Sequence, residues 1–187
     1  MKYLCSCCGK EHKEWPAITF PSPINYHELS EIQKNSIAEL DSDFCSIKYE
    51  NQTDRFIRVV LVQKIEDSEL DLQYGFWVSL SEVNFNDYKL IFKDKNNKKN
   101  EYFGWLCSSI PQYEDMLSIP TTVVLNNNGN RPEIFPHKDF QHPFVKDYYN
   151  GISLIEAEKR VHDVLGFVAA RVGKVEANKV KKWWKIW

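Results

Sequence analysis

Short segments rich in β-branched and aromatic residues, separated by polar connections, constrain the fold of this 187-residue chain more than any other feature. Residues 44–49 and 56–62 are two such segments, joined by the polar run 50–54 (ENQTD). Residues 74–80 follow as a third, rich in aromatic rings and Val. Such runs between turn residues are typical of strands, so the first two predict a β-hairpin and the third a further strand.

A second hairpin is predicted toward the C-terminus. Residues 121–125 and 133–135 are β-rich, and the connection 126–130 reads NNNGN. Asn and Gly adopt the positive φ angles that tight connections need. By contrast, residues 93–101 (KDKNNKKNE) lack apolar anchors and predict a surface loop.

Helical signals lie between the strands. Residues 27–40 carry apolar side chains at near-helical spacing, with Ser30 and Gln33 as a capping box if the helix starts late. Three more helices are predicted, from Ser81 to about Phe92, from Pro143 to about Tyr149, and from the capping box of Ser153 and Glu156 onward. Hairpins with helices at intervals predict an α+β fold, in which an antiparallel sheet carries helices on one face.

Charge is unevenly distributed along the chain. Residues 1–165 hold 18 Lys and Arg against 25 Asp and Glu, a net charge of −7. Residues 166–187 hold six basic residues and one acid, a net charge of +5. The sequence therefore predicts a single domain over 1–165, whose residues 1–16 hold a cluster of cysteines, and a basic Trp-rich tail at 166–187. An acidic domain lacks the basic field of nucleic-acid binders, so no nucleic-acid partner is expected.

The tail has its own candidate partner. In a helix, Trp183, Ile186 and Trp187 would share one face, with lysines on the other. Trp and Lys together suit an anionic membrane surface, where rings lie at headgroup depth. Alternatively, the tail folds back onto the acidic domain or is frayed.

Cysteine usage and hydropathy indicate a cytoplasmic protein. No stretch approaches the roughly 20 apolar residues of a membrane span, and the N-terminus lacks the apolar core of a secretory signal. Three of the five cysteines crowd together at Cys5, Cys7 and Cys8. A disulfide framework spaces and pairs its cysteines. Reduced thiols therefore fit better, with a metal as the reason for the cluster.

The spacing Cys5-x-x-Cys8, followed by a glycine, carries the strongest chemical signal. Two thiolates spaced by two residues grip one Zn²⁺ from a tight turn, and the glycine lets the backbone turn toward the sulfurs. A closed structural site needs four ligands. We predict that the other two ligands are His12, four residues after Cys8, and Cys45, which opens a predicted strand. Residues 1–16 are thus predicted to form a zinc knuckle. Cys7 in place of His12, or a metal-free pair of thiols, are the alternatives.

Several short motifs occur in order along the chain. They are Cys5-x-x-Cys8-Gly9-x-x-His12, Ser42-Asp43-x-Cys45, Phe56-x-Arg58, Tyr74-Gly75-x-Trp77-Val78-Ser79-Leu80-Ser81, Phe103-Gly104-Trp105-Leu106, Pro111-x-Tyr113, Arg131-Pro132, His142-Pro143 and Gly151-Ile152-Ser153. Over about residues 1–165 they resemble a bacterial family known as domain of unknown function 2199. The resemblance implies a compact single domain and implies no activity.

Another set of polar residues lies near Pro143. His137, Asp139 and His142 could hold a catalytic metal with an open position, or act as general bases. The alternative is structural: Asp139 starts a turn, His142 caps the helix opened by Pro143, and His137 lies at the surface. We favour the structural interpretation, since metal sites usually add a ligand from elsewhere in the chain.

Two glycine–indole motifs and one arginine also allow two interpretations. Gly75-Phe76-Trp77 and Gly104-Trp105 either form a stacking platform for a flat ligand or, more commonly, pack in the core where backbones approach closely. Arg58 alternates with apolar residues in a predicted strand. It either anchors an anion or pairs with a carboxylate at the sheet's edge.

Together these features predict a zinc-stabilised binding domain that docks or neutralises a protein partner. The structural zinc would fix the N-terminal arm on the sheet. The sequence contains no nucleophile elbow, phosphate-binding loop, dinucleotide fingerprint or HExxH helix. The competing hypothesis is a small metal-dependent hydrolase that uses His137, Asp139 and His142.

Overall fold

The computed structural model describes residues 3–4, 11–12, 15–92, 101–126 and 130–163, with side chains from residue 15 onward. Its strands are β1 (Tyr3–Leu4), β2 (Glu11–His12), β3 (Ile18–Thr19), β4 (Ala38–Leu40), β5 (Phe44–Lys48), β6 (Thr53–Gln63), β7 (Leu72–Ser79), β8 (Glu101–Leu106), β9 (Pro120–Val124) and β10 (Glu133–Pro136). Its helices are α1 (Ile24–His27), α2 (Glu31–Ile37), α3 (Glu82–Ile91), α4 (Pro143–Asn150) and a helical segment at 154–163. This mixture confirms the α+β class.

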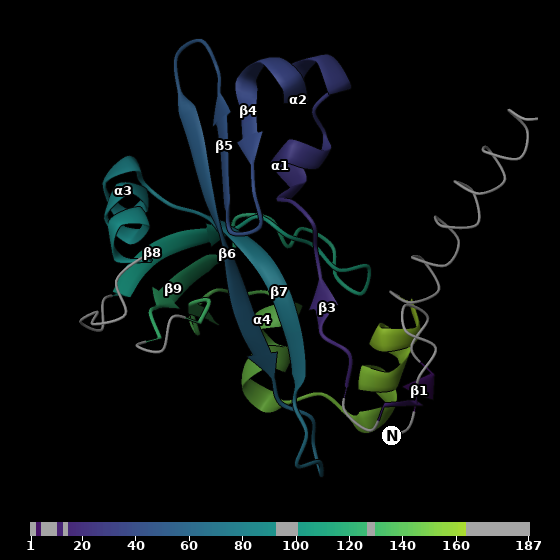
Figure 1. Cartoon of the computed structure of the whole chain (residues 1–187). Coiled ribbons are helices and arrows are strands. Elements are labelled where there is room, and N and C mark those ends of the chain that lie inside the picture. Colours follow the sequence, from purple (N-terminus) through teal and green to yellow (C-terminus); the bar gives the residue numbers. More distant parts are fainter. Residues whose placement is uncertain (1–2, 5–10, 13–14, 93–100, 127–129, 164–187) are drawn as a thin grey trace, which may run out of the picture.

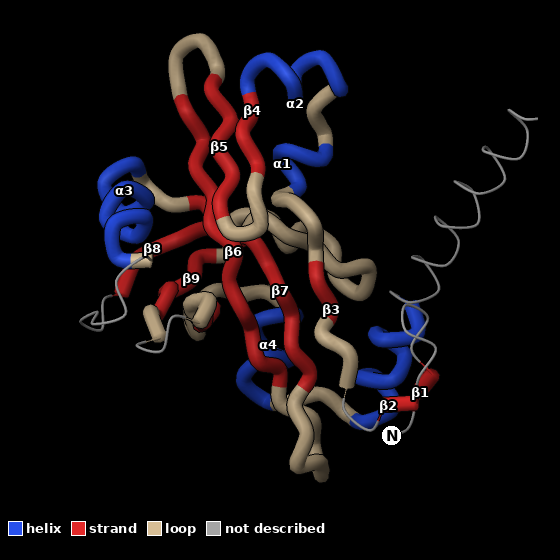
Figure 2. The backbone as a smooth tube through the Cα atoms, in the orientation of Figure 1, coloured by secondary structure: helices blue, strands red, loops and turns tan. Residues whose placement is uncertain are grey.

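Five of the strands close into a barrel, and four of them, β6, β7, β8 and β9, are labelled in Figures 1 and 2. β7 pairs with β8, β8 with β9, β9 with β10, β10 with β6, and β6 again with β7. β5 and β4 extend the sheet from β6, and β3 is added beside β7. Closure pairs both edges of the five-stranded sheet, so their backbone donors and acceptors are used.

This barrel corrects the predicted antiparallel sheet. β6 and β10 run parallel, with Val60 opposite Glu133, and β3 runs parallel to β7, with Ile18 opposite Tyr74. The sequence carries no signal for these pairings, because each joins segments that are far apart in the chain and have no turn between them.

Both predicted hairpins are confirmed. β5 pairs antiparallel with β6, from Phe44 opposite Ile57 to Lys48 opposite Thr53. β9 pairs antiparallel with β10. Residues 127–129 of the second connection, and 93–100 of the predicted surface loop, lie outside the described residues.

The predicted helix over 27–40 proves to be the end of α1, the short helix α2 and the strand β4. The late helix start is confirmed by a capping box. The Gln33 N–H donates to Ser30 Oγ (3.3 Å), and the Ser30 N–H donates to Gln33 Oε1 (3.0 Å). After Ile37 the chain turns into β4, because Ala38–Leu40 pair with β5 and complete its second row of hydrogen bonds.

The remaining helices begin as predicted, and the end of the last one lies outside the described residues. Ser81 Oγ accepts the Asn84 N–H (3.2 Å) at the start of α3, and Ser153 Oγ accepts the Glu156 N–H (3.2 Å) at the start of the 154–163 segment. α4 ends at Gly151, whose φ of 89° is a conformation that glycine adopts without strain.

Alternate residues of the barrel strands form the main apolar core. β6 contributes Ile57, Val59 and Leu61, and β7 contributes Tyr74, Phe76 and Val78. α3, α4 and the 154–163 segment bury further side chains in the same cluster, namely Phe85, Tyr88, Phe144, Val145, Ala157 and Val161.

A second apolar cluster lies on the opposite face of the same strands. It contains Cys45, Ile47, Phe56, Trp77 and Cys107, and the partly buried side chains packed against it include Tyr26, Leu29 and Ile37. Helices therefore cover the sheet from more than one side, contrary to the prediction of one covered face. Figure 1 shows α1 and α2 beside β4 at one end of the molecule and α4 at the other. Strands that are buried on both faces have nearly continuous apolar sequences, without the alternation of apolar and polar residues seen in strands with one exposed face.

Two predictions concern residues outside this description. The side chains of residues 1–14, which include the predicted ligands Cys5, Cys8 and His12, are not described, and neither is any part of the predicted tail at 166–187. Within the described part of the chain, no helix is both long and apolar enough to cross a membrane.

Candidate functional site

The outer face of β8 exposes two aromatic rings. Tyr102, Gly104 and Leu106 point inward, whereas Phe103 is 44% and Trp105 45% exposed. Their ring centroids lie 4.9 Å apart with the planes at 88°, an edge-to-face contact. Two large rings are thus held in a fixed arrangement in contact with solvent.

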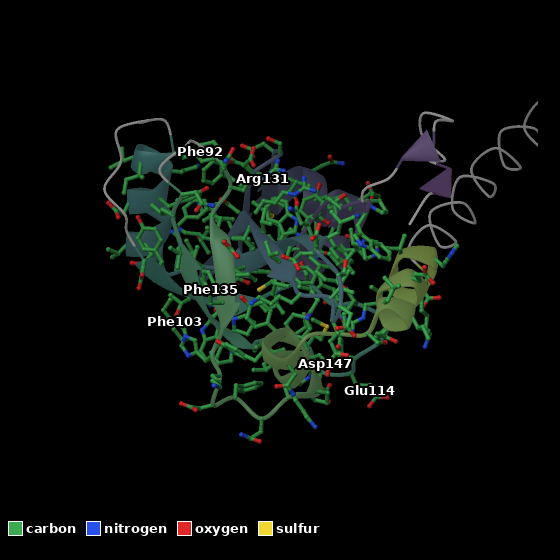
Figure 3. All side chains as sticks on the ribbon, turned by 90° about the horizontal axis from the view of Figure 1, so that it is seen from below. Phe92, Phe103, Glu114, Arg131, Phe135 and Asp147 are labelled. Atoms are coloured by element: carbon green, nitrogen blue, oxygen red, sulfur yellow. The ribbon has the colours of Figure 1, made fainter. Side chains whose placement is uncertain are left out.

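Neighbouring strands extend this surface. Phe103 lies opposite Thr122 of β9, which lies opposite Phe135 of β10. The His137 ring lies 5.5 Å from the Phe103 ring, and its Nε2 lies 3.2 Å from Thr122 Oγ1. Figure 3 shows Phe103 and Phe135 on the same side of the barrel. We call Phe103, Trp105, Phe135 and His137 the aromatic face.

A groove of about 390 Å³ borders the aromatic face at Trp105. Its lining is Asn25, Thr53, Asp54, Arg55, Phe56, Ser79, Leu80, Trp105, Cys107 and Ser118. This size falls in the range of about 300–1,000 Å³ that is usual for ligand sites. Trp105 therefore belongs to both the aromatic face and the groove.

The groove contains one acid and one base with different partners. Arg55 donates to Glu82 Oε1 (2.7 Å) and to the Thr53 carbonyl (2.8 Å). Asp54 accepts a hydrogen bond from Gln52 Nε2 (3.1 Å). Burial raises the pKa of Asp54, an effect only partly offset by the charge of Arg55. A carboxylate near an exposed indole is a chemical environment suited to a cationic side chain.

The predicted zinc ligands lie only partly within the described residues. Cys5 and Cys8 lie outside them, and His12 lies opposite Tyr3 where β2 pairs with β1. Cys45 is buried in the second apolar cluster, and burial raises the pKa of its thiol to about 12. The zinc site, with Cys45 as its fourth ligand, therefore stays a prediction.

His137, Asp139 and His142 are not assembled as a metal site. In the part of the chain that the structure describes, no three His, Cys, Asp or Glu side chains are placed to hold an ion. His142 instead caps α4: its Nδ1 accepts the Phe144 N–H (3.1 Å), and its Nε2 lies 2.8 Å from the Glu114 carbonyl oxygen. The structural interpretation of His142 is confirmed.

The two glycine–indole motifs have different outcomes. Trp77 is fully buried, as predicted, and its Nε1–H donates to the Phe20 carbonyl (3.0 Å). Gly104 sits at a close backbone approach, since a Cβ there would lie 3.0 Å from the Ser79 carbonyl oxygen. Trp105, however, points to solvent. The core interpretation is right for Trp77 and wrong for Trp105.

Sequence reasoning missed a buried polar network around Arg160, which is 1% exposed. Arg160 donates to Glu156 (2.8 Å), to the Tyr74 hydroxyl (3.3 Å) and to the Tyr113 hydroxyl. Asp147 accepts from Tyr113 (2.5 Å) and lies 3.5 Å from Arg160. The available signal was the position of Arg160 on the apolar side of the predicted helix. The network joins four separate parts of the chain and is structural.

One comparison with known proteins identifies the chain's family. The family model described as "Uncharacterized protein conserved in bacteria (DUF2199)" matches residues 4–152, a range that includes the aromatic face and the groove. Comparisons with curated proteins and with solved structures gave no match. Because the family model covers most of its length, the chain belongs to the bacterial DUF2199 family.

Proposed function

We propose that the chain is a binding domain whose aromatic face and adjoining groove contact a basic protein. The observation that carries this proposal is the exposed Phe103–Trp105 pair on a rigid barrel strand. Aromatic anchors supply most of the binding energy in protein interfaces, and two rings already held edge to face lose little conformational freedom on binding.

Charge supports a basic partner. Residues 1–165 have a net charge of −7. In the groove, Arg55 is paired with Glu82. The Asp54 carboxylate accepts a hydrogen bond from Gln52 and forms no ion pair among the described residues. We propose that an Arg or Lys side chain of the partner enters the groove. Its charge would meet Asp54, and its stem or guanidinium plane would stack on Trp105.

Zinc is proposed as the support of the N-terminal arm. The support for this is the Cys5-x-x-Cys8 spacing together with the pairing of β1 with β2, which brings the residues flanking this motif together. Cys5, Cys8 and His12 are the proposed ligands from this segment. Cys45 is the weakest member of the predicted set, because its thiol packs among apolar side chains in β5.

The free thiols support a reducing compartment. Cys45 and Cys107 are both buried and unpaired with any other described cysteine. Thiols that stay reduced are usual in the cytoplasm, and we propose that location for the protein.

Differential capture tests the binding proposal. The full-length protein, a Phe103→Ser/Trp105→Ser variant and Asp54→Asn are immobilised, and bacterial proteins retained by each are quantified by mass spectrometry. Ile32→Ser is the matched control, because Ile32 is an 81% exposed apolar residue on α2 that lines neither surface. The proposal expects a basic protein that the wild type and Ile32→Ser retain and the other two lose. The same retained proteins on all four would contradict it.

A further inference from the structure

The groove and the aromatic face place one carboxylate beside two exposed rings. Asp54 forms no ion pair among the described residues, whereas Arg55, its neighbour in the groove, is held by Glu82 at 2.7 Å. The rings of Phe103 and Trp105 are 44% and 45% exposed. A segment that carries both lysine and aromatic side chains would therefore meet the carboxylate by charge and the two rings by stacking and cation–π contacts.

The last residues of this chain have that composition. Residues 179–187 read KVKKWWKIW, with four lysines, three tryptophans and no acid. The tail at 166–187 has a net charge of +5, against −7 for residues 1–165. The tail lies outside the described residues and outside the family match, which ends at residue 152. By sequence, then, the tail complements the domain in charge and matches the aromatic face in its side chains.

The tail begins close to the loop that lines part of the groove. Gln112 Nε2 donates to the carboxylate of Asp163, the last described residue, at 2.9 Å. Gln112 belongs to the connection between β8 and β9, which contributes Cys107 and Ser118 to the groove. Gln112 precedes Ser118 by six residues, so the backbone path between them is at most about 20 Å. The point from which the tail starts is thus fixed near the groove.

The tail is also long enough to reach it. Lys179 follows Asp163 by 16 residues. A segment of that length spans about 24 Å as a helix and up to about 50 Å when fully extended. Both lengths exceed the path of about 20 Å between Gln112 and Ser118. A binding segment tethered at such a range acts at an effective concentration on the order of 1 mM, so even a weak contact would be populated.

We infer that residues 179–187 occupy the groove and the aromatic face of the same chain. A lysine of this segment meets Asp54, and an indole packs against the Phe103–Trp105 pair. A basic partner must then displace the tail before it binds. This regulatory role rests on the proposed function, whereas the contact between tail and groove does not.

Charge reversal in the full-length chain tests the contact. The tail variant Lys181→Glu/Lys182→Glu/Lys185→Glu would release the segment, because its new carboxylates repel Asp54. The indole N–H resonance of Trp105, identified by its loss in Trp105→Phe, should therefore differ between the wild type and the tail variant. An identical Trp105 resonance in both proteins would contradict the inference.

A matched control makes the same change of charge elsewhere. Lys64, Lys146 and Lys159 are exposed and line neither the groove nor the aromatic face. Their triple replacement by Glu should leave the Trp105 resonance where it is in the wild type. Unchanged amide spectra away from the substitutions establish that each variant is folded. A wild-type Trp105 resonance that moves with protein concentration would place the tail of a second copy in the groove and would overturn the inference.

Peptide binding separates this inference from the proposed function. The tail variant should bind a short arginine-containing peptide about tenfold more tightly than the wild type or the control. That factor is expected when a tether at about 1 mM holds a segment whose own Kd is about 0.1 mM. A shifted Trp105 resonance without peptide binding by any of the three proteins would support the tail contact and remove the proposed function. An unshifted resonance with equal peptide binding by all three would overturn the tail contact and leave the proposed function standing.

Discussion

The guanidinium of Arg160 lies over the ring of Tyr113, with Cζ 5.0 Å from the ring centroid, while it donates to the hydroxyl of Tyr74. Arg160 belongs to the 154–163 segment and Tyr74 to β7, so this contact ties the last described helical segment to the barrel. Glu156 and Asp147 supply the negative charge that a buried guanidinium requires.

Removing Arg160 should therefore destabilise the domain. Arg160→Ala leaves Asp147, Glu156 and two hydroxyls without their shared partner, and we expect a loss of about 3–5 kcal/mol in the free energy of unfolding. Urea denaturation followed by tryptophan fluorescence measures it. Lys159→Ala, at the exposed neighbouring position, is the control and should change stability by less than about 0.5 kcal/mol. Equal effects of the two changes would contradict the structural role.

The ionised Asp54 side chain should lower the stability of the folded protein at neutral pH. Burial raises its pKa above the usual 3.8, so the folded protein takes up the proton more readily than the unfolded chain. Stability from this group is therefore lost as the pH rises through the raised pKa. Asp54→Asn should raise Tm at pH 7, and the gain should shrink as the pH falls into the acidic range. Calorimetry at several pH values tests this, with exposed Asp71→Asn as control. A Tm gain that is independent of pH would contradict it.

His142 should tolerate replacement by another capping residue. Asn can accept the Phe144 N–H as His142 Nδ1 does, so His142→Asn should keep most of the stability. His142→Ala removes the cap and should cost about 1 kcal/mol in unfolding free energy. Chemical denaturation of both variants distinguishes them. If His142→Asn kept the fold but abolished a hydrolytic activity of the wild type, the catalytic hypothesis would replace the structural one.

Metal content tests the zinc proposal. Protein purified under reducing conditions should carry one zinc per chain by elemental analysis. Cys8→Ser should lower both zinc content and Tm, because metal-binding free energy is also folding free energy. Cys107→Ser should leave zinc content unchanged.

The fourth ligand is settled by Cys45→Ala. From its place among apolar side chains, we expect this variant to keep its zinc and lose stability through the cavity left behind. Loss of zinc in Cys45→Ala would restore the four-ligand prediction. Wild-type protein without metal would remove the zinc proposal altogether.

Local chemistry made several elements predictable. The caps at Ser30, Ser81 and His142 act within three residues of themselves, and the hairpin connections contain their own turn residues. The β6–β10 and β3–β7 pairings have no such local signal, because each joins segments that are far apart in the chain and have no turn between them. For this reason the α+β class could be predicted and the barrel could not.

The candidate site was harder to predict from the sequence than the fold class was. Trp77 and Trp105 follow glycines in similar motifs, yet Trp77 faces the second apolar cluster and Trp105 faces solvent. The difference depends on which faces other elements cover, and α1 and α2 cover the outer face beside Trp77. A motif of two or three residues does not contain that information.

The binding proposal is tested most directly at the Trp105 indole. A short arginine-containing peptide is titrated into the full-length protein while the indole N–H resonances of its six tryptophans are followed. We predict a saturable shift at Trp105, none at buried Trp77, and loss of the Trp105 shift in Asp54→Asn. No saturable shift at Trp105, or the same shift in Asp54→Asn as in the wild type, would contradict a cation-binding groove beside the aromatic face.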